Sequence, residues 1–230
     1  MQGLFITFEG TEGCGKTTQV QMLADKLQKD GLPVVVLREP GGTPIGEEIR
    51  HTLKHSLNNA AMTPETELLL MNASRTQLVR EVIRPALQSG KIVLCDRFYD
   101  STTAYQGYGR GLNLDYVRKI IEFAVGETRP DLTLFLDIPL ELSLKRRAIR
   151  KNQSNDKSKS GANENNLRDR FEEADIEFFK RVQQGFHKIA EKEPKRIKTV
   201  DATKPIEEVF KNICEIVEPF LDRHKRLLRK

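Results

Sequence analysis

The sequence predicts an α/β fold, a doubly wound parallel sheet of five strands with helices on both faces. The first observation is that five short apolar runs, at residues 4–8, 33–37, 92–95, 132–136 and, less clearly, 197–200, alternate with longer segments of helical periodicity. The second is that the runs are largely continuous rather than alternating, which is typical of parallel strands covered on both faces. This βαβα order indicates a parallel sheet.

Helical patterns fill the segments between the runs, at about residues 17–29, 44–56, 64–89, 114–125, 139–150, 168–192 and 205–228. Thr63 before Pro64 fits an N-cap followed by proline at the first helical position, and Pro205 opens the last helix similarly. The sequence has no internal repeat. We therefore expect residues 1–230 to form a single domain.

One polar segment, residues 151–166, interrupts the pattern. It contains one alanine and no larger apolar residue, so we expect it to be mobile. A long polar loop within a compact domain is commonly a lid or a tolerated insertion. We expect a mobile lid at about residues 146–172, with an insertion at 151–166. The flanking arginines are Arg146, Arg147, Arg150, Arg168 and Arg170.

Composition narrows the class of protein. Hydrophobic residues make up 38% and charged residues 31% of the 230 residues, which suits a soluble protein with a buried core. No apolar run approaches the ~20 residues of a membrane span, and a strand predicted from residue 4 argues against a signal peptide. The net charge of +5, part of it in residues 224–230, fits a solvated helix end and phosphate-binding arginines better than nucleic-acid binding. Three scattered cysteines favour the reducing cytoplasm.

The motif around which the chain is organised is GTEGCGKT at residues 10–17, which matches G-x-x-x-x-G-K-[ST] at every fixed position. A glycine-rich turn between a strand and a helix points backbone N–H groups into one concavity. In such a P-loop Lys16 reaches the β- and γ-phosphates, and the Thr17 hydroxyl ligates Mg²⁺. We expect ATP to be bound by Gly10, Thr11, Glu12, Gly13, Cys14, Gly15, Lys16, Thr17 and Thr18.

Three acids near predicted strand ends leave alternatives open. Glu12 is either a solvent-facing loop acid or the acceptor of a hydroxyl from a second substrate. Asp96 and Asp137 each end a predicted strand, where ligands of open α/β sheets bind, so either could hold the metal. Arg97 beside Asp96 could neutralise charge on a transferring phosphoryl group, which favours Asp96.

Two sets of arginines favour phosphoryl transfer between two phosphates. Planar guanidinium groups bind phosphate oxygens bidentately and offset the repulsion between two anions. One set brackets the polar segment, and the other lies near strand ends or early helix turns. The second set is Arg38, Arg50, Arg75 and Arg97. Residues 98–111, for which we predict no helix, offer aromatic rings, hydroxyls and an amide that could contact a base.

In this order the motifs resemble the bacterial thymidylate kinase family. The resemblance covers nearly the whole chain and rests on FEGTEGCGKTT at 8–18, REPGGT at 38–43, DRF at 96–98, STTAYQ at 101–106, RPDLT at 129–133 and DRFE at 169–172. It implies a P-loop NTPase fold and a nucleoside-monophosphate kinase, usually a homodimer. It also implies transfer of the ATP γ-phosphoryl group to dTMP with Mg²⁺, giving dTDP for dTTP synthesis and ADP.

The resemblance implies roles for individual residues. Lys16 and Thr17 would serve the ATP phosphates and, with Asp96, the metal, and Arg50 and Arg97 would hold the acceptor phosphate. The remaining dTMP contacts belong to the sugar and the base. Glu12 would face the sugar 3′-hydroxyl, Tyr105 would fill the place of a ribose 2′-hydroxyl, and Arg75 would read the thymine edge. Other implied contacts are Arg38, Pro40, Met71, Thr102 and Gln106.

The chain departs from the family pattern at two places. The P-loop lacks the basic residue that some members carry between its glycines, and in members of this kind the lid donates the catalytic arginine. Arg150 and Arg170 are the best candidates for this catalytic arginine, and Arg147 is the next candidate. Met71 stands where many members have an aromatic residue that stacks on thymine, although a flexible thioether can also pack on a ring.

Two other functions remain open. One is another pyrimidine nucleotide or nucleoside kinase, for example one that acts on dCMP, UMP or a deoxynucleoside. The other is a P-loop ATPase that acts on a macromolecule through the basic C-terminal segment. The short chain and the missing glutamate-bearing ATPase motif argue against the second.

Overall fold

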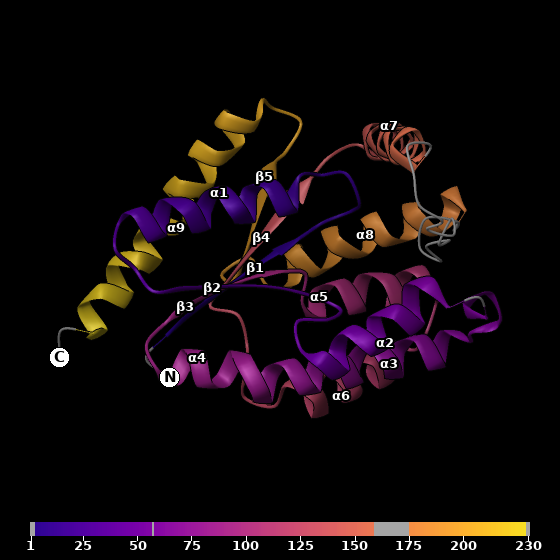
Figure 1. Cartoon of the computed structure of the whole chain (residues 1–230), viewed down its shortest axis with the longest axis horizontal. Coiled ribbons are helices and arrows are strands. Elements are labelled where there is room, and N and C mark those ends of the chain that lie inside the picture. The colour runs from indigo at the N-terminus through magenta and orange to yellow at the C-terminus, as the bar shows by residue number, and fades with distance from the viewer. Residues whose placement is uncertain (1–2, 57, 159–174, 229–230) are drawn as a thin grey trace.

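The computed structural model describes residues 3–56, 58–158 and 175–228. Its centre is a five-stranded, all-parallel sheet in the order β2-β3-β1-β4-β5 (Figure 1). The strands are β1 Leu4–Glu9, β2 Val34–Arg38, β3 Ile92–Asp96, β4 Leu132–Asp137 and β5 Ile197–Asp201. All five predicted strands are therefore confirmed. The chain starts at the central strand β1, crosses to the edge strand β2, returns to β3 beside β1 and then continues through β4 to β5 on the other side, so a topological switch point lies beside β1.

Helices cover both faces of the sheet (Figure 1), which confirms the doubly wound arrangement. Ile6 and Phe8 of β1 pack toward α1 (Lys16–Lys29) and α9 (Ile206–Leu228). Phe5, the residue before Ile6, faces the opposite layer. This layer contains α3 (Pro64–Leu78), α4 (Arg84–Gln88), α6 (Leu114–Val125) and α8 (Ile176–Lys192). Strands buried on both faces explain the continuous apolar runs in the sequence.

The helix predicted at residues 64–89 consists of three parts. Thr63 caps α3 by accepting the Thr66 N–H at 3.2 Å, with Pro64 in the first turn, as predicted. A π-helical turn, Val79–Ile83, follows and leads into α4. Pro85 lies just after this turn and has no N–H to close a helical bond, so the wider turn falls where the regular ladder is interrupted.

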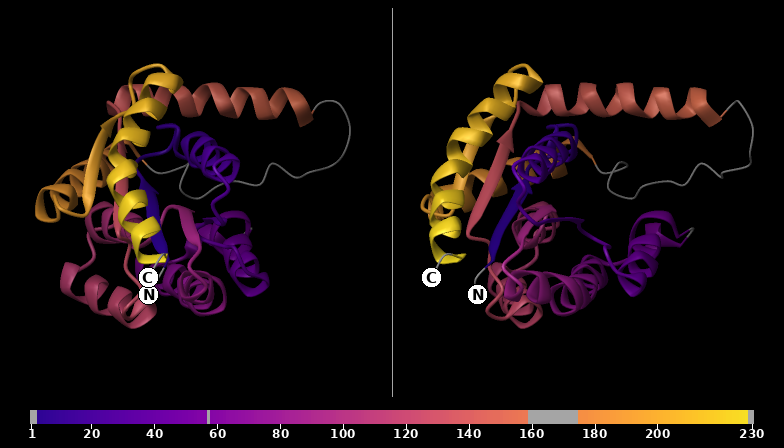
Figure 2. Two further views of the ribbon diagram at one scale, coloured as in Figure 1. Left: turned by 90° about the vertical axis from the view of Figure 1, so that its left-hand side faces the viewer. Right: turned by 60° about the vertical axis from the view of Figure 1, so that its left-hand side comes forward.

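Helix α7 (Leu140–Ser158) corrects the prediction of a polar loop at 151–166. Residues 151–158 are helical, because the segment from 140 to 158 contains neither glycine nor proline to end the helix. Figure 2 shows α7 projecting away from the sheet. Residues 159–166 of the insertion and the lid residues as far as 172 lie outside the described residues, so the mobile lid remains a prediction.

Two helical segments were not predicted. Helix α5 (Tyr99–Thr102) continues into a π-helical turn, Thr103–Gly109, and a short 3₁₀ turn forms at Asn59–Ala61. Threonines and glycines give 99–109 a low helix propensity, and packing against α8 overrides it. A Cβ atom on Gly109 would lie 2.7 Å from the Phe178 ring, so glycine permits this close approach.

Helix α2 (Pro44–His55) carries Arg50. Its N-cap, Thr43, accepts the Gly46 N–H at 3.0 Å. Among the described residues, no helix is both long and apolar enough to cross a membrane.

Candidate active site

The P-loop joins β1 to α1 at the switch point of the sheet. Gly10 has a φ of 140°, and a Cβ atom there would lie 2.5 Å from the Leu136 carbonyl oxygen, so only glycine fits. The Lys16 ammonium is folded over the loop and donates to the carbonyl oxygens of Gly10 at 3.1 Å and Thr11 at 2.8 Å. The loop therefore holds its lysine beside the N-terminus of α1, where anions are bound.

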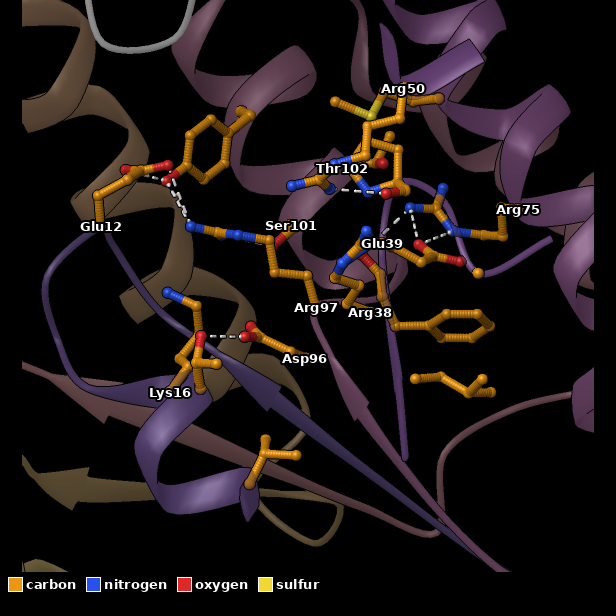
Figure 3. Close-up of a pocket in the computed structure, with 18 of the residues that line it drawn as sticks. Glu12, Lys16, Arg38, Glu39, Arg50, Arg75, Asp96, Arg97, Ser101 and Thr102 are labelled. Carbon is orange, nitrogen blue, oxygen red and sulfur yellow. Dashed lines mark hydrogen bonds and ion pairs between the residues drawn. The ribbon is translucent and has the colours of Figure 1, made fainter. Parts of the chain in front are cut away.

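A cavity of about 650 Å³ extends from the P-loop to the β2–α2 turn, α3 and α5 (Figure 3). It brings together most of the residues predicted for the site. These are Glu12, Gly13, Gly15, Lys16, Thr17, Thr18, Arg38, Pro40, Arg50, Met71, Arg75, Asp96, Arg97, Thr102, Tyr105 and Gln106. Gly10, Thr11 and Cys14 do not line the cavity, and the Cys14 side chain packs in the core with α1.

The register of the sheet places Asp96 between the ends of β1 and β2, where it lines this cavity. Asp96 lies opposite Phe8 of β1 on one side and Arg38 of β2 on the other. Its carboxylate accepts the Thr17 hydroxyl at 2.6 Å. Mg²⁺ prefers oxygen ligands and commonly takes one or two protein groups besides substrate phosphates, so this pair fits the metal.

The rival acid, Asp137, lies elsewhere. It lines a separate hollow with Thr199 and Asp201, and its carboxylate is 3.4 Å from His187 Nε2. The geometry therefore favours Asp96 over Asp137 as the acid that serves a metal at the P-loop.

Arg97 links the P-loop to the rest of the cavity (Figure 3). Its Nη1 donates to the Gly10 carbonyl at 3.0 Å and to Ser101 Oγ at 2.9 Å. Its Nη2 donates to Glu12 at 3.0 Å and to the Tyr105 hydroxyl at 3.3 Å. Arg97 has a φ of 71°, a left-handed conformation that is unusual for a residue with a side chain and is typical of functional sites.

Glu12 faces the cavity, not open solvent. Partial burial disfavours its charged form, but the positive charges of Arg97 and Lys16 outweigh this and lower the Glu12 pKa. The Tyr105 hydroxyl donates to Glu12 at 2.6 Å, and burial raises the Tyr105 pKa so that this hydroxyl stays protonated. Of the two interpretations of Glu12, the geometry favours a carboxylate that faces a substrate.

The acceptor arginines have different surroundings. Arg50, in the middle of α2, donates to the Pro40 carbonyl at 2.7 Å, while Arg38 is half-exposed and paired with Glu47 at 3.0 Å. Arg75 is buried in the last turn of α3 and pairs with Glu39 at 2.6 Å. The prediction that this set lies near strand ends or early helix turns is therefore wrong for Arg50 and Arg75, although both reach the cavity.

The lid arginines are less well defined. Arg150 belongs to α7, and Arg170 lies outside the described residues. The guanidinium of Arg147 lies 4.2 Å from the centre of the Phe179 ring. Two α7 side chains contact the P-loop instead: Ser143 donates to the Glu12 carbonyl at 2.6 Å, and Arg146 donates to the Gly13 carbonyl at 3.1 Å.

A buried carboxylate behind the cavity was not predicted as part of the site. Glu9 ends β1 and is 1% exposed. It accepts the Phe98 N–H at 2.7 Å and the Ser101 hydroxyl at 2.5 Å, so it fastens the turn that carries Arg97. Burial, with a smaller effect from the nearby Asp100 charge, raises the Glu9 pKa to about 8. The signal in the sequence that could have indicated this role of Glu9 was a charged residue directly after an apolar run.

The raised Glu9 pKa predicts a pH dependence of stability. The folded protein keeps the Glu9 proton up to about pH 8, whereas the unfolded chain loses it near the ordinary glutamate pKa of 4.5. The free energy of unfolding should therefore fall as pH rises through this window, by at most about 1.4 kcal/mol per pH unit from this group. Glu9→Gln, which cannot ionise, should lack this slope in urea unfolding measured from pH 5 to 9. Parallel curves for the two proteins would contradict the assignment.

The fold and the cavity together define a class of protein. A parallel sheet with a P-loop at its switch point, and with acceptor arginines in the same cavity, is the architecture of a P-loop nucleotide kinase. The model of the thymidylate kinase family matches residues 8–213, and the chain belongs to this family.

Comparisons with individual relatives support the assignment to this family. The chain is 49% identical to the thymidylate kinase of Chlorobium luteolum over 206 residues, which cover 90% of this chain and 92% of the relative. It is 44% identical to the thymidylate kinase of Kosmotoga olearia over 224 residues, or 97% and 98% of the two chains. The crystal structure of thymidylate kinase from Ehrlichia chaffeensis superimposes with a TM-score of 0.72 at 32% identity, and covers 94% of this chain and 98% of that one. Neither of the other two functions considered above is favoured.

Proposed function

We propose that this protein transfers the γ-phosphoryl group of ATP to dTMP. The observation that carries the proposal is that Arg97, on the acceptor side, donates to the P-loop carbonyl of Gly10 at 3.0 Å, so both halves share one cavity. A dTMP phosphate oxygen would attack the γ-phosphorus in line. This oxygen is already anionic, so no general base is needed, and catalysis consists of positioning and charge neutralisation.

On the donor side, the backbone of the P-loop and Lys16 would bind the ATP phosphates. Lys16 would exchange its carbonyl partners for phosphate oxygens. Thr17 and Asp96 would hold Mg²⁺, which when bound neutralises negative charge on the β- and γ-phosphates.

On the acceptor side, Arg97 and Arg50 would hold the dTMP phosphate, with Arg38 at the open edge. Glu12 would accept the sugar 3′-hydroxyl. The Tyr105 hydroxyl is held on Glu12 at 2.6 Å and would leave no room for a ribose 2′-hydroxyl, which favours deoxynucleotides. Met71, Arg75, Thr102 and Gln106 line the part of the cavity that would take the pyrimidine.

The test is ADP release, in a coupled assay, with ATP and a panel of dTMP, dUMP, dCMP, UMP and thymidine. We expect a strong preference for dTMP, with dTDP as the product. A preference for dCMP, UMP or thymidine would support the alternative function, another pyrimidine nucleotide or nucleoside kinase. ATP hydrolysis stimulated by nucleic acid, without dTDP, would overturn the proposal.

We propose that a lid arginine completes the transition-state charge neutralisation. Arg150→Ala or Arg170→Ala should lower kcat by about 10³-fold or more, because an arginine on the transferring phosphoryl group typically contributes this much. Binding of dTMP, measured by calorimetry, should change little, and Lys145→Ala on the exposed surface of α7 is the control. If neither substitution lowers kcat, the arginine is supplied from elsewhere.

We propose a homodimer, as is usual in the family. Tyr116 and Phe123 lie two turns apart on one face of α6 and are 66% and 81% exposed, which is unusual for large apolar side chains in a monomer. The molar mass in solution, measured by light scattering, tests this assembly.

A further inference from the structure

Three residues of α3 at a spacing of four, Glu67, Met71 and Arg75, lie along one face of the helix. Met71 and Arg75 line the cavity, whereas Glu67 is fully buried behind it. Glu67 Oε1 accepts Gln106 Nε2 at 2.8 Å, and Glu67 Oε2 accepts Arg110 Nη2 at 2.9 Å. The Glu67 carboxylate has no access to the cavity, but it is thus hydrogen-bonded to Gln106, a side chain that lines the cavity.

This bond decides which end of the Gln106 amide faces the cavity. An ionised carboxylate accepts hydrogen bonds and cannot donate them. Both oxygens of Glu67 accept from the Arg110 guanidinium, at 3.2 and 2.9 Å. Gln106 must therefore turn its NH₂ group to Glu67 and its carbonyl oxygen away from it. Among the described residues, this oxygen has no hydrogen-bond partner, so it is the acceptor that Gln106 offers to a ligand.

Arg75 is fixed in a similar way and offers a donor. Its Nε and Nη2 contact Glu39 Oε2 at 2.8 and 2.6 Å, and Nη2 also donates to the Phe98 carbonyl at 3.2 Å. Its Nη1 donates to Asn72 Oδ1 at 2.9 Å. A guanidinium has five N–H groups, so one N–H on Nη1 remains for the cavity (Figure 3).

We propose that Glu67 is a specificity-determining positioning residue: by fixing the Gln106 amide, it makes the base pocket accept thymine or uracil and reject cytosine. This inference rests on the proposed function. Thymine and uracil present an acceptor at C4 and a donor at N3, which match the Arg75 N–H and the Gln106 carbonyl. Cytosine presents a donor at C4 and an acceptor at N3, so like groups would face each other at both positions. Sites built from fixed polar groups discriminate strongly because a mismatched ligand leaves buried groups unpaired.

The test is Glu67→Gln in the full chain. The new amide can accept from Arg110 and donate to the Gln106 carbonyl, which lets the Gln106 amide turn its NH₂ group to the cavity. We expect the ratio of kcat/KM for dTMP to kcat/KM for dCMP to fall at least tenfold. The ratio of dTMP to dUMP should stay within about twofold, because the two bases share the same edge. Arg110→Lys is the matched control, since it keeps a positive charge beside Glu67 and leaves the Gln106 contact, and the ratio of dTMP to dCMP should stay within about twofold.

The outcomes separate this inference from a merely structural role for Glu67. A structural role would lower the rates with dTMP and dCMP in parallel, and an unchanged ratio would overturn the proposal. If Glu67→Gln does not fold, Gln106→Leu decides the question. This variant keeps the Glu67–Arg110 pair, and it too must lose discrimination against dCMP for the proposal to stand. If the unaltered protein does not phosphorylate dTMP, the proposed function fails first. If it does and the ratios do not change, only this inference fails.

Discussion

Replacing Arg97 with alanine is expected to lower kcat by about 10³- to 10⁵-fold, the usual contribution of an arginine on a transferring phosphoryl group. Its guanidinium contacts the P-loop at Gly10 and the acceptor side at Tyr105, so it links the two proposed substrate sites. The variant should remain folded. Glu12 and Tyr105 keep their mutual hydrogen bond at 2.6 Å, and neither is left without a partner. Turnover and circular dichroism measure the two effects.

The backbone at Arg97 provides a matched control. Its φ of 71° is strained for alanine but not for glycine, so Arg97→Gly should be more stable than Arg97→Ala by about 1 kcal/mol. Both variants lack the guanidinium and should be equally inactive. Arg84→Ala, which removes contacts to Thr128 and the Val125 carbonyl outside the cavity, should keep normal turnover. Near-normal turnover of either Arg97 variant would contradict the assignment.

The parts of the molecule that were predictable have local or periodic signals. Buried parallel strands leave continuous apolar runs, and a P-loop needs its glycines at fixed spacing. The sheet, the donor half and the position of Asp96 follow from these signals. The helix at 99–109 was missed because its own residues disfavour a helix and packing against α8 supplies the stabilisation. The helical continuation of α7 through 158 was missed because polarity was taken as a sign of a loop, although no helix-breaking residue is present.

The buried carboxylates that orient the cationic and amide groups could not be predicted. Glu9, Glu39 and Glu67 bond to partners that are 36 to 92 residues distant in sequence. No periodicity links such pairs, and a lone glutamate in a sequence is normally a surface residue. The sequence therefore indicates which side chains touch the substrates, whereas the structure shows what fixes their direction.

Replacing Asp96 with asparagine is expected to lower kcat/KM by about a hundredfold or more, because charge stabilisation at a metal-assisted phosphoryl transfer amounts to several kcal/mol. Asp96 accepts the Thr17 hydroxyl at 2.6 Å, and asparagine can keep this hydrogen bond through its carbonyl oxygen. The change therefore removes negative charge and leaves the local packing intact. The Mg²⁺ concentration needed for half-maximal rate should rise, and the stabilisation of the fold by ADP with Mg²⁺, measured by thermal unfolding, should shrink relative to ADP alone.

The second strand-end acid supplies the control that separates a metal role from a general effect of charge. Asp137 also follows a buried strand, but it lies 3.4 Å from His187 and lines a different hollow. Asp137→Asn removes the same charge from the same edge of the sheet, and it should leave kcat/KM within about threefold and the Mg²⁺ dependence unchanged, as is usual for a substitution away from the site. If Asp137→Asn shifts the Mg²⁺ dependence and Asp96→Asn does not, the assignment of the metal acid is reversed. If both act equally, the effect is the net charge of the sheet edge, and neither aspartate holds the metal.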